Sequence, residues 1–250
     1  MVLEGRKILL GVTGGIAAYK AVEIASRLRK KGAEVHVVMT KEAACFVTPL
    51  TFREITGQPV SLDMWEEPAH WNVEHIALAR LADLVLIAPA TANIIAKAAA
   101  GIADDMLTTT LLAVTSPIFF APAMNSAMYE NPVTQENMAK LQARGWHKIE
   151  PASGYLACGA SGVGRLPEPQ DIVRELEEAG ARGKTPDGVV PKNSFQESLG
   201  EHRGTSRDPH LRSGQPARGS EHRDHQGNPD GVGAERQEPG GAPPGASLLL

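Results

Sequence analysis

The sequence predicts an α/β fold of three layers, in which helices cover both faces of a doubly wound parallel sheet. Short apolar segments of strand length alternate with segments of helical periodicity, which is typical of βαβ units. The segment 83–90 is continuously apolar, as expected for a parallel strand buried on both faces. This pattern extends over residues 1–180, which we interpret as one domain.

The first predicted unit is a buried strand at 6–12, a tight turn at 13–15 and a helix at 16–32 that ends at a glycine. The apolar positions expected on one side of this helix, and therefore against the core, are Ile16, Tyr19, Ala21, Val22 and Leu28.

A second strand is predicted at 33–40, followed by the start of a helix at 41–46. The stretches 48–57 and 63–72 lack a clear period and are expected to be irregular, and a short helix is expected at 76–82.

The second half repeats the pattern. A long helical region with a glycine interruption is predicted at 91–114, a fourth strand at 116–123 and a helix at 131–145. Residues 147–152 are expected to form a fifth strand and 167–180 the last helix, with prolines near its start.

The composition changes after residue 180. Residues 181–250 are dominated by Gly, Pro, Arg, Ser, Gln and His, and Phe195 is the only aromatic residue among them. Such a segment cannot bury enough apolar surface to offset its chain entropy, so we predict a disordered, low-complexity tail. Its bias is typical of an out-of-frame translation of a GC-rich gene. We therefore keep a frameshift as a hypothesis that re-sequencing of the gene tests.

Charge and composition exclude several classes of function. The net charge of −4 and the scattered basic residues argue against a nucleic acid partner. No signal peptide and no apolar stretch of membrane-spanning length is found, so a cytoplasmic protein with no membrane partner is expected. Cys45 and Cys158 are too few for a disulfide framework or a cysteine metal site, and no metal is expected. We expect Cys45 to pack in the core.

Polar or small residues follow three predicted strands. Gly14 and Gly15 follow the first, Thr40 ends the second, and Thr91 and Asn93 follow the third. Because parallel strands end at one edge of a sheet, these residues should converge into a pocket for a mononucleotide phosphate. For the glycines the alternative is an ordinary tight turn, and for the threonines it is a helix N-cap.

Three further segments carry candidate chemistry. His75 precedes the short helix at 76–82, and imidazole suits a proton acceptor near neutral pH. Asn125 ends the segment APAMN, where a helix N-cap is the alternative. Cys158 lies in a glycine-rich segment at 157–169 that has the character of a mobile lid.

Together, GVTGGIAAYK, VEHIALA, PATAN, PAMN and ACGASGVGRLPEP resemble the corresponding segments of the flavin-dependent cysteine decarboxylases. The resemblance implies a Rossmann-like or flavodoxin-like flavoprotein fold with FMN as cofactor. It assigns FMN contacts to Gly14, Gly15, Thr40, Thr91 and Asn93. It also implies that Ala123 and Met124 line the substrate pocket and that Asn125 binds the substrate carboxylate. His75 would be the active-site base and Cys158 a late proton donor. Ala160 departs from the acidic residue that often follows the family's CG pair.

The function implied by the resemblance is decarboxylation of 4′-phospho-N-pantothenoylcysteine to 4′-phosphopantetheine in coenzyme A biosynthesis. FMN would oxidise the cysteine moiety to a thioaldehyde, which gives the electron sink that loss of CO₂ needs. The alternatives are a decarboxylase of peptides with a C-terminal cysteine, a non-catalytic regulatory protein on the same fold, and an NADP-binding reductase that uses Lys41.

The resemblance also implies a homotrimer, or a homododecamer built from trimers, with sites near subunit interfaces. Bacterial family members fused to a synthetase would begin a second nucleotide-binding domain near residue 181. The strand and glycine-rich turn that should mark it are absent from 181–250.

Overall fold

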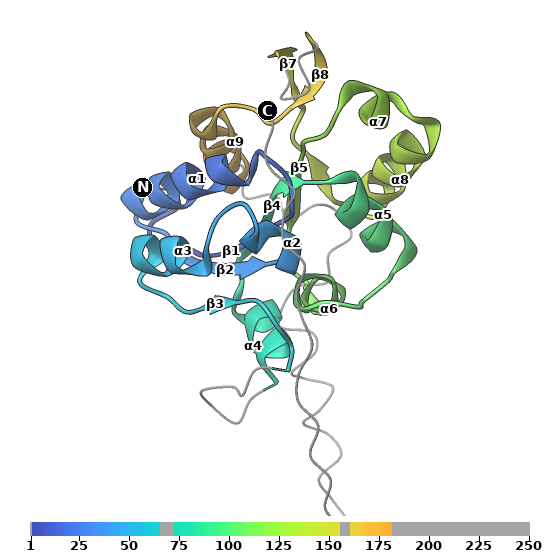
Figure 1. Ribbon diagram of the computed structural model, residues 1–250. Helices are drawn as coiled ribbons and strands as arrows, with labels where there is room; N and C mark the ends of the chain where they lie inside the picture. The colour runs from blue at the N-terminus through green and yellow to red at the C-terminus, as the bar shows by residue number, and fades with distance from the viewer. Residues whose placement is uncertain (1, 66–72, 156–160, 182–250) are drawn as a thin grey trace, which may run out of the picture. The chain divides into compact units, whose positions relative to one another are not determined.

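The computed structural model describes residues 2–65, 73–155 and 161–181. Its central element is a parallel sheet of six strands (Figure 1). The strands are β1 (Lys7–Val12), β2 (Glu34–Met39), β3 (Val60–Ser61), β4 (Leu84–Ala90), β5 (Ile118–Pro122) and β6 (His147–Lys148). The predicted strands at 6–12, 33–40, 83–90 and 116–123 are therefore confirmed.

The strands lie side by side in the order β3-β2-β1-β4-β5-β6. From β1 the chain first builds the sheet outward to β3, and then returns to add β4 on the other side of β1. Residue Leu10 is thus paired with Val37 on one side and Leu86 on the other. This reversal is the switch point of a doubly wound sheet, where ligands bind at the carboxyl ends of the strands.

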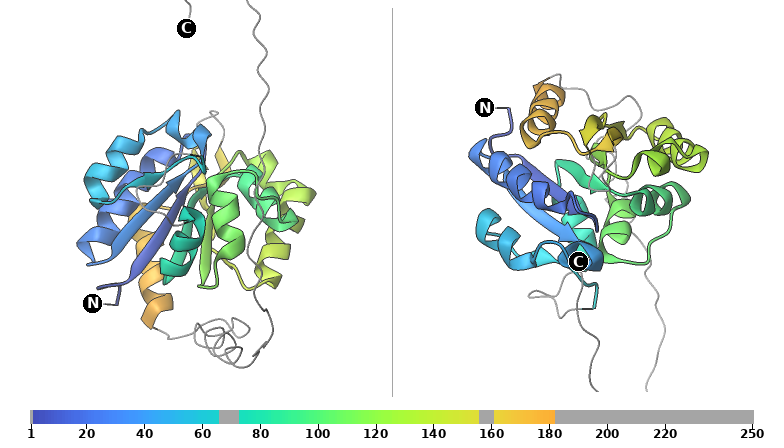
Figure 2. Two further views of the ribbon diagram at one scale, coloured as in Figure 1. Left: turned by 90° about the horizontal axis from the view of Figure 1, so that it is seen from below. Right: turned by 45° about the horizontal axis from the view of Figure 1, so that its top comes forward.

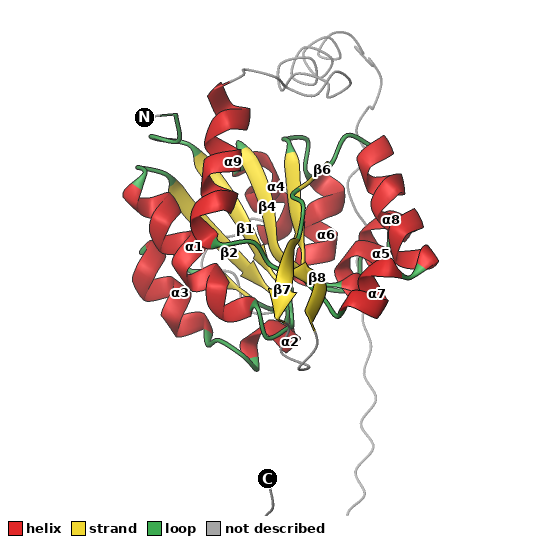
Figure 3. Ribbon diagram, turned by 90° about the horizontal axis from the view of Figure 1, so that it is seen from above, coloured by secondary structure: helices red, strands yellow, loops and turns green. Residues whose placement is uncertain are grey.

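Helices cover both faces of the sheet, as predicted. Figure 3 shows α1, α3 and α9 in front of the sheet and α4 and α6 behind it, and Figure 2 gives two further views of the same layers. The helices are α1 (Ala18–Lys30), α2 (Lys41–Ala44), α3 (Pro49–Thr56), α4 (Glu74–Leu81), α5 (Ala92–Ala100), α6 (Met106–Ala113), α7 (Ser126–Glu130), α8 (Pro132–Ala143) and α9 (Pro169–Ala181).

Each face of the sheet has its own hydrophobic core. Ile8, Leu10 and Leu86 pack with α1, α3 and α9 on one face. Leu9, Ile87 and Phe120 pack with α5, α6 and α8 on the other. Alternate residues of one strand therefore enter opposite cores, which explains why the sequence of each strand is continuously apolar.

The predicted helical region at 91–114 consists of two helices. The first, α5, ends at Gly101, whose φ of 74° is the left-handed conformation that glycine adopts readily. The second, α6, begins after Asp105, which forms a capping box with Thr108. The glycine interruption that the sequence shows is thus a helix end.

One expectation about the elements was wrong, and the structure refines two others. Residues 48–57 are not irregular, because α3 begins with Pro49 at its first turn and buries Phe52. The expected strand at 147–152 pairs with β5 only through two residues. The chain then enters a separate antiparallel hairpin, formed by β7 (Ala152–Tyr155) and β8 (Ser161–Arg165). Part of the glycine-rich segment at 157–169 is therefore a strand.

Three side chains expected in the core lie at the surface. Ile16 and Tyr19 are 59% and 60% exposed, whereas Ala21 and Leu28 are buried as predicted. The helix begins only at Ala18, so Ile16 belongs to the preceding turn. Cys45 is also exposed, because α2 ends just before it.

The predicted tail at 181–250, beyond Ala181, lies outside the described residues. Within the described part of the chain, none of the helices has the length and apolar character needed to cross a membrane.

Candidate active site

A cavity of about 790 Å³ opens at the carboxyl ends of the parallel strands, beside the switch point between β1 and β4. This volume is in the range of small-molecule and cofactor sites. The turn after β1, the ends of β2, β4 and β5, and the end of β8 all contribute to its walls. The lining residues include Gly14, Gly15, Thr40, Thr91, Asn93, Ala123, Met124 and Asn125. The structure thus places eight of the ten predicted site residues around one cavity.

The two glycines of the first turn differ in what surrounds them. A Cβ atom at Gly14 would lie 2.3 Å from the Cβ of Glu42, so the close approach of α2 requires glycine there. A Cβ atom at Gly15 would make only an ordinary contact of 3.6 Å with Thr91. Packing therefore explains Gly14, and Gly15 is the position where side-chain volume would act mainly on the cavity.

Thr13 joins the ends of β1 and β4. Its buried hydroxyl donates a hydrogen bond of 2.6 Å to the carbonyl oxygen of Pro89, and the amide of Thr91 lies 3.3 Å from the same hydroxyl oxygen. Thr13 itself lines the cavity, although from the sequence it was predicted only as part of the turn. This contact fixes the two strand ends between which the cavity opens.

The predicted N-caps are present. The hydroxyl oxygen of Thr40 accepts from the amide of Ala43, and that of Thr91 accepts from the amide of Ile94. A cap uses the oxygen as acceptor and leaves the hydroxyl hydrogen as a donor. Capping therefore orients both hydroxyl groups at the cavity, where each retains a hydrogen that could be donated to a bound anion.

Asn125 caps α7 in the same way. Its Oδ1 accepts a hydrogen bond of 2.9 Å from the amide of Ala127. The NH₂ group is the part of the amide that can donate to a ligand carboxylate, because an amide oxygen only accepts hydrogen bonds.

Exposed apolar side chains form part of the cavity wall. Ile16, Tyr19 and Met128 line the cavity and are each at least half exposed. Ile16 and Tyr19 were predicted to face the core, because an apolar side chain that faces a ligand cavity has the same sequence signature as one that faces the core.

The β7–β8 hairpin is attached to the loop after β5, at the carboxyl end of the sheet (Figure 3). The amide of Met124 donates to the carbonyl oxygen of Gly164 at 2.9 Å, and the hydroxyl of Ser126 donates to the carbonyl oxygen of Val163 at 2.7 Å. These two hydrogen bonds therefore hold the hairpin base against the predicted substrate loop.

A charged cluster lies where the hairpin meets α1. Lys20 and Arg165 line the cavity, and both donate to Oε1 of Glu168, at 3.1 and 2.5 Å. The hydrogen bond from Lys20 is the main cause that lowers the pKa of Glu168, against a smaller opposing effect of burial. Neither Lys20 nor Arg165 was predicted as a site residue, although Arg165 belongs to the same glycine-rich segment, 157–169, as Cys158.

His75 does not line this cavity. It is the second residue of α4, half-buried, and α4 packs against α6 behind the sheet. The preceding residue, Glu74, accepts a short hydrogen bond from the hydroxyl of Ser61, which attaches the start of α4 to β3. Cys158 and Ala160 lie outside the described residues.

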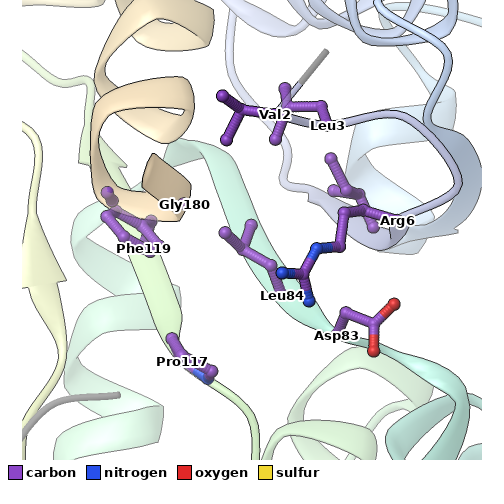
Figure 4. A pocket seen from close by; sticks show the side chains of 10 residues that line it. Val2, Leu3, Arg6, Asp83, Leu84, Pro117, Phe119 and Gly180 are labelled. Carbon is purple, nitrogen blue, oxygen red and sulfur yellow. The ribbon is translucent and has the colours of Figure 1, made fainter. Parts of the chain in front are cut away.

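A second cavity, of about 260 Å³, lies at the opposite edge of the sheet (Figure 4). Leu84 and Phe119 form its floor near the starts of β4 and β5, and Arg6 extends its side chain toward Asp83 at the rim. None of the predicted site residues lines it, so the predicted chemistry belongs to the larger cavity.

The fold and the cavity define a class of flavin-binding α/β proteins, and comparison with known families confirms it. Residues 2–179 match the Flavoprotein family, and the chain belongs to it.

The particular relatives are proteins of coenzyme A biosynthesis. The coenzyme A biosynthesis bifunctional protein CoaBC of Vibrio vulnificus (strain YJ016) is 51% identical over 176 residues, which cover 70% of this chain and 44% of the relative. CoaBC of Bacillus subtilis (strain 168) is also 51% identical over 176 residues, with coverage of 70% and 43%. The chain therefore spans less than half the length of these curated relatives.

Solved structures agree with this relationship. A cysteine-to-serine variant of PPC decarboxylase complexed with pantothenoylaminoethenethiol is 34% identical, with a TM-score of 0.63 and coverage of 70% of this chain and 98% of that one. The FMN-dependent cysteine decarboxylase SpaF is 34% identical with a TM-score of 0.62, covering 72% and 99%. The predicted resemblance and fold class are thus confirmed.

Proposed function

We propose that this protein is an FMN-dependent decarboxylase that converts 4′-phospho-N-pantothenoylcysteine to 4′-phosphopantetheine. The observation that carries the proposal is the convergence of the strand-end residues and the PAMN loop on one cavity. Relatives that share about half of the aligned residues are named as coenzyme A biosynthesis proteins.

The residues present fit FMN. The volume of the cavity suits a mononucleotide, and its exposed apolar side chains, Ile16, Tyr19 and Met128, offer a surface for a flat ring. Gly15 leaves the backbone accessible, and the hydroxyl groups of Thr40 and Thr91 can donate to phosphate or ribityl oxygens. The side chain of Asn93 makes no hydrogen bond with any described residue, so its exposed amide is also open to the cofactor. Bound FMN supplies the oxidation of the cysteine moiety that makes loss of CO₂ possible.

The loop after β5 holds the substrate. The NH₂ group of Asn125 donates to the substrate carboxylate, and Ala123 and Met124 line the space beside it. An amide stabilises the carboxylate without protonating it, so the bond to CO₂ can still break. As the resemblance implies, Cys158 would donate a proton to the enethiol left by loss of CO₂, as the two electrons held by the reduced cofactor return to it.

His75 acts as the base in a cavity shared between subunits. Because His75 does not line the cavity of its own chain, its role requires that another copy brings it there. Val73, the N-cap residue just before α4, and Leu112 on α6 are 60% and 61% exposed. This apolar surface beside His75 supports a homotrimer or a homododecamer in which α4 packs against a neighbour.

The catalytic domain comprises residues 1–180, and the tail at 181–250 is not needed for the reaction. All residues assigned above lie before α9, and the match to the Flavoprotein family ends at residue 179. Such an enzyme is expected in the cytoplasm, where both thiols stay reduced.

An absorption spectrum of the purified protein, followed by identification of the released chromophore, tests the cofactor. The proposal predicts noncovalent FMN, and CO₂ release from 4′-phospho-N-pantothenoylcysteine by the loaded protein. A full-length protein and a variant truncated after Ala181 that both fail to bind FMN would contradict it.

A further inference from the structure

The part of the cavity wall beside the hairpin carries a cluster with excess positive charge, whereas the acidic lining residues Glu42 and Asp105 belong to α2 and to the N-cap of α6. Lys20 and Arg165 share a single carboxylate, that of Glu168. Two cations and one anion leave this cluster with a net charge of +1. This local excess of positive charge favours an anionic ligand group beside the hairpin.

The excess charge resides on Arg165. The side chain of Lys20 is only 9% exposed, and its ammonium group donates to the carbonyl oxygen of Leu166 and to Glu168. Lys20 is therefore held by protein acceptors. The side chain of Arg165 is 41% exposed and lines the cavity.

The geometry of Arg165 leaves donors open to the cavity. A guanidinium group has five N–H donors, and among the described residues only Glu168 accepts from this one, through Nη2. Gly154 on β7 lies beneath the group, since a Cβ atom there would be 3.4 Å from Nη1. Glu168 and the hairpin backbone thus fix the guanidinium plane and leave its other N–H groups unpaired.

We propose that Arg165 binds the phosphate monoester of the substrate and selects against cysteine compounds that lack this group. The inference rests on the function proposed above and deepens it. A phosphate monoester carries nearly two negative charges at neutral pH, and a fixed guanidinium group matches its oxygens in geometry. The other two anions already have sites, because Asn125 takes the substrate carboxylate and the strand-end donors take the phosphate of FMN.

This assignment also separates the two substrate classes that the sequence left open. A peptide with a C-terminal cysteine has a carboxylate but no phosphate, so it would leave the N–H groups of Arg165 that Glu168 does not accept from without an acceptor.

The test compares kcat/KM for 4′-phospho-N-pantothenoylcysteine and its dephosphorylated form, with full-length protein loaded with FMN. For the wild type, we expect the phosphate to raise kcat/KM by about 10- to 100-fold, the range expected for charged hydrogen bonds. In Arg165→Met this advantage should fall to within about threefold, while the dephosphorylated substrate reacts at nearly the wild-type rate. Arg165→Lys keeps the charge without the planar fork and should retain part of the advantage. Arg174→Met, in an exposed ion pair with Asp171 on α9, is the matched control and should retain all of it.

Three results would overturn the assignment. The first is a phosphate advantage in kcat/KM that persists in Arg165→Met. The second is an equal loss of activity on both substrates in this variant. The third is a loss of its affinity for FMN but not for riboflavin, which would place the guanidinium group at the cofactor phosphate. If the wild-type protein decarboxylates neither substrate and binds neither 4′-phosphopantetheine nor pantetheine, the proposed function fails as well. Activity on both substrates with an unchanged ratio removes only the role of Arg165.

Discussion

The amide of Met124 donates a hydrogen bond of 2.9 Å to the carbonyl oxygen of Gly164, which joins the loop after β5 to the β7–β8 hairpin. The two segments are far apart in the sequence, yet they form adjacent parts of the cavity wall. The position of the hairpin relative to Asn125 therefore depends on this contact.

Replacing Gly164 with alanine should separate the hairpin from the loop. Its φ is 120°, and a Cβ atom would lie 2.4 Å from the carbonyl oxygen of Met124. We expect a loss of kcat of about tenfold or more, since small displacements at a reacting centre are costly. Bound FMN should be retained, because the strand-end contacts are untouched.

Flavin content and kcat, measured side by side, check this prediction. Gly101→Ala is the control, since its φ of 74° is also left-handed but no atom lies within 4 Å of the added Cβ. Equal kcat values for the two variants would show that the close approach to Met124 does not matter.

Alanine substitutions at Gly14 and Gly15 should have different effects. Gly14→Ala forces Glu42 and α2 to move, so we expect a loss of about 1–3 kcal/mol in the free energy of unfolding. Gly15→Ala meets only Thr91 at 3.6 Å and should leave stability nearly unchanged while weakening FMN binding.

Thermal unfolding of the FMN-free proteins and FMN titrations separate the two effects. If Gly15→Ala binds FMN as tightly as the wild type, the cofactor does not approach this turn.

Stability should depend on Glu168 in acid. Its pKa is lowered, mainly by the hydrogen bond from Lys20, so its ion pairs stabilise the folded state fully only above its ordinary pKa of 4.5. As the pH falls from 4.5 through the lowered pKa, the carboxylate is protonated and this contribution is lost. The stability difference between wild type and Glu168→Gln should therefore be largest near neutral pH and shrink below 4.5.

Urea unfolding at several pH values between neutrality and 3 measures this difference. Glu54→Gln, which affects an exposed pair with Arg53, is the control. A difference between wild type and Glu168→Gln that grows toward acid would have the wrong sign for the proposed ion pairs.

Mixed oligomers should restore activity to two inactive variants. If His75 and Asn125 of one site come from different subunits, co-expression of His75→Ala with Asn125→Ala creates some sites with both residues intact. For random mixing in a symmetric ring, about a quarter of the sites should be intact. Activity of purified mixed oligomers, compared with that of each variant alone, tests this. No recovery in oligomers shown to contain both chains would place the two residues in the same subunit.

Much of the fold and cavity could be predicted from the sequence because strand ends are visible in it. Thr40 and Thr91 each follow a buried strand, and parallel strands end at one edge. The hairpin could not be predicted, because SGVGR contains glycines in place of alternating apolar residues. Ile16 and Tyr19 were misplaced because periodicity does not distinguish a cavity wall from a core. The distance of His75 from the cavity has no sequence signal.

The most direct test of the central claim is release of CO₂ from 4′-phospho-N-pantothenoylcysteine by FMN-loaded protein, with Asn125→Ala measured beside it. We predict stoichiometric CO₂ and 4′-phosphopantetheine from the wild type. Asn125→Ala should bind FMN but lose about 100-fold or more in kcat/KM, since the carboxylate loses its oriented donor. FMN-loaded wild-type protein that releases no CO₂ from this substrate would contradict the account.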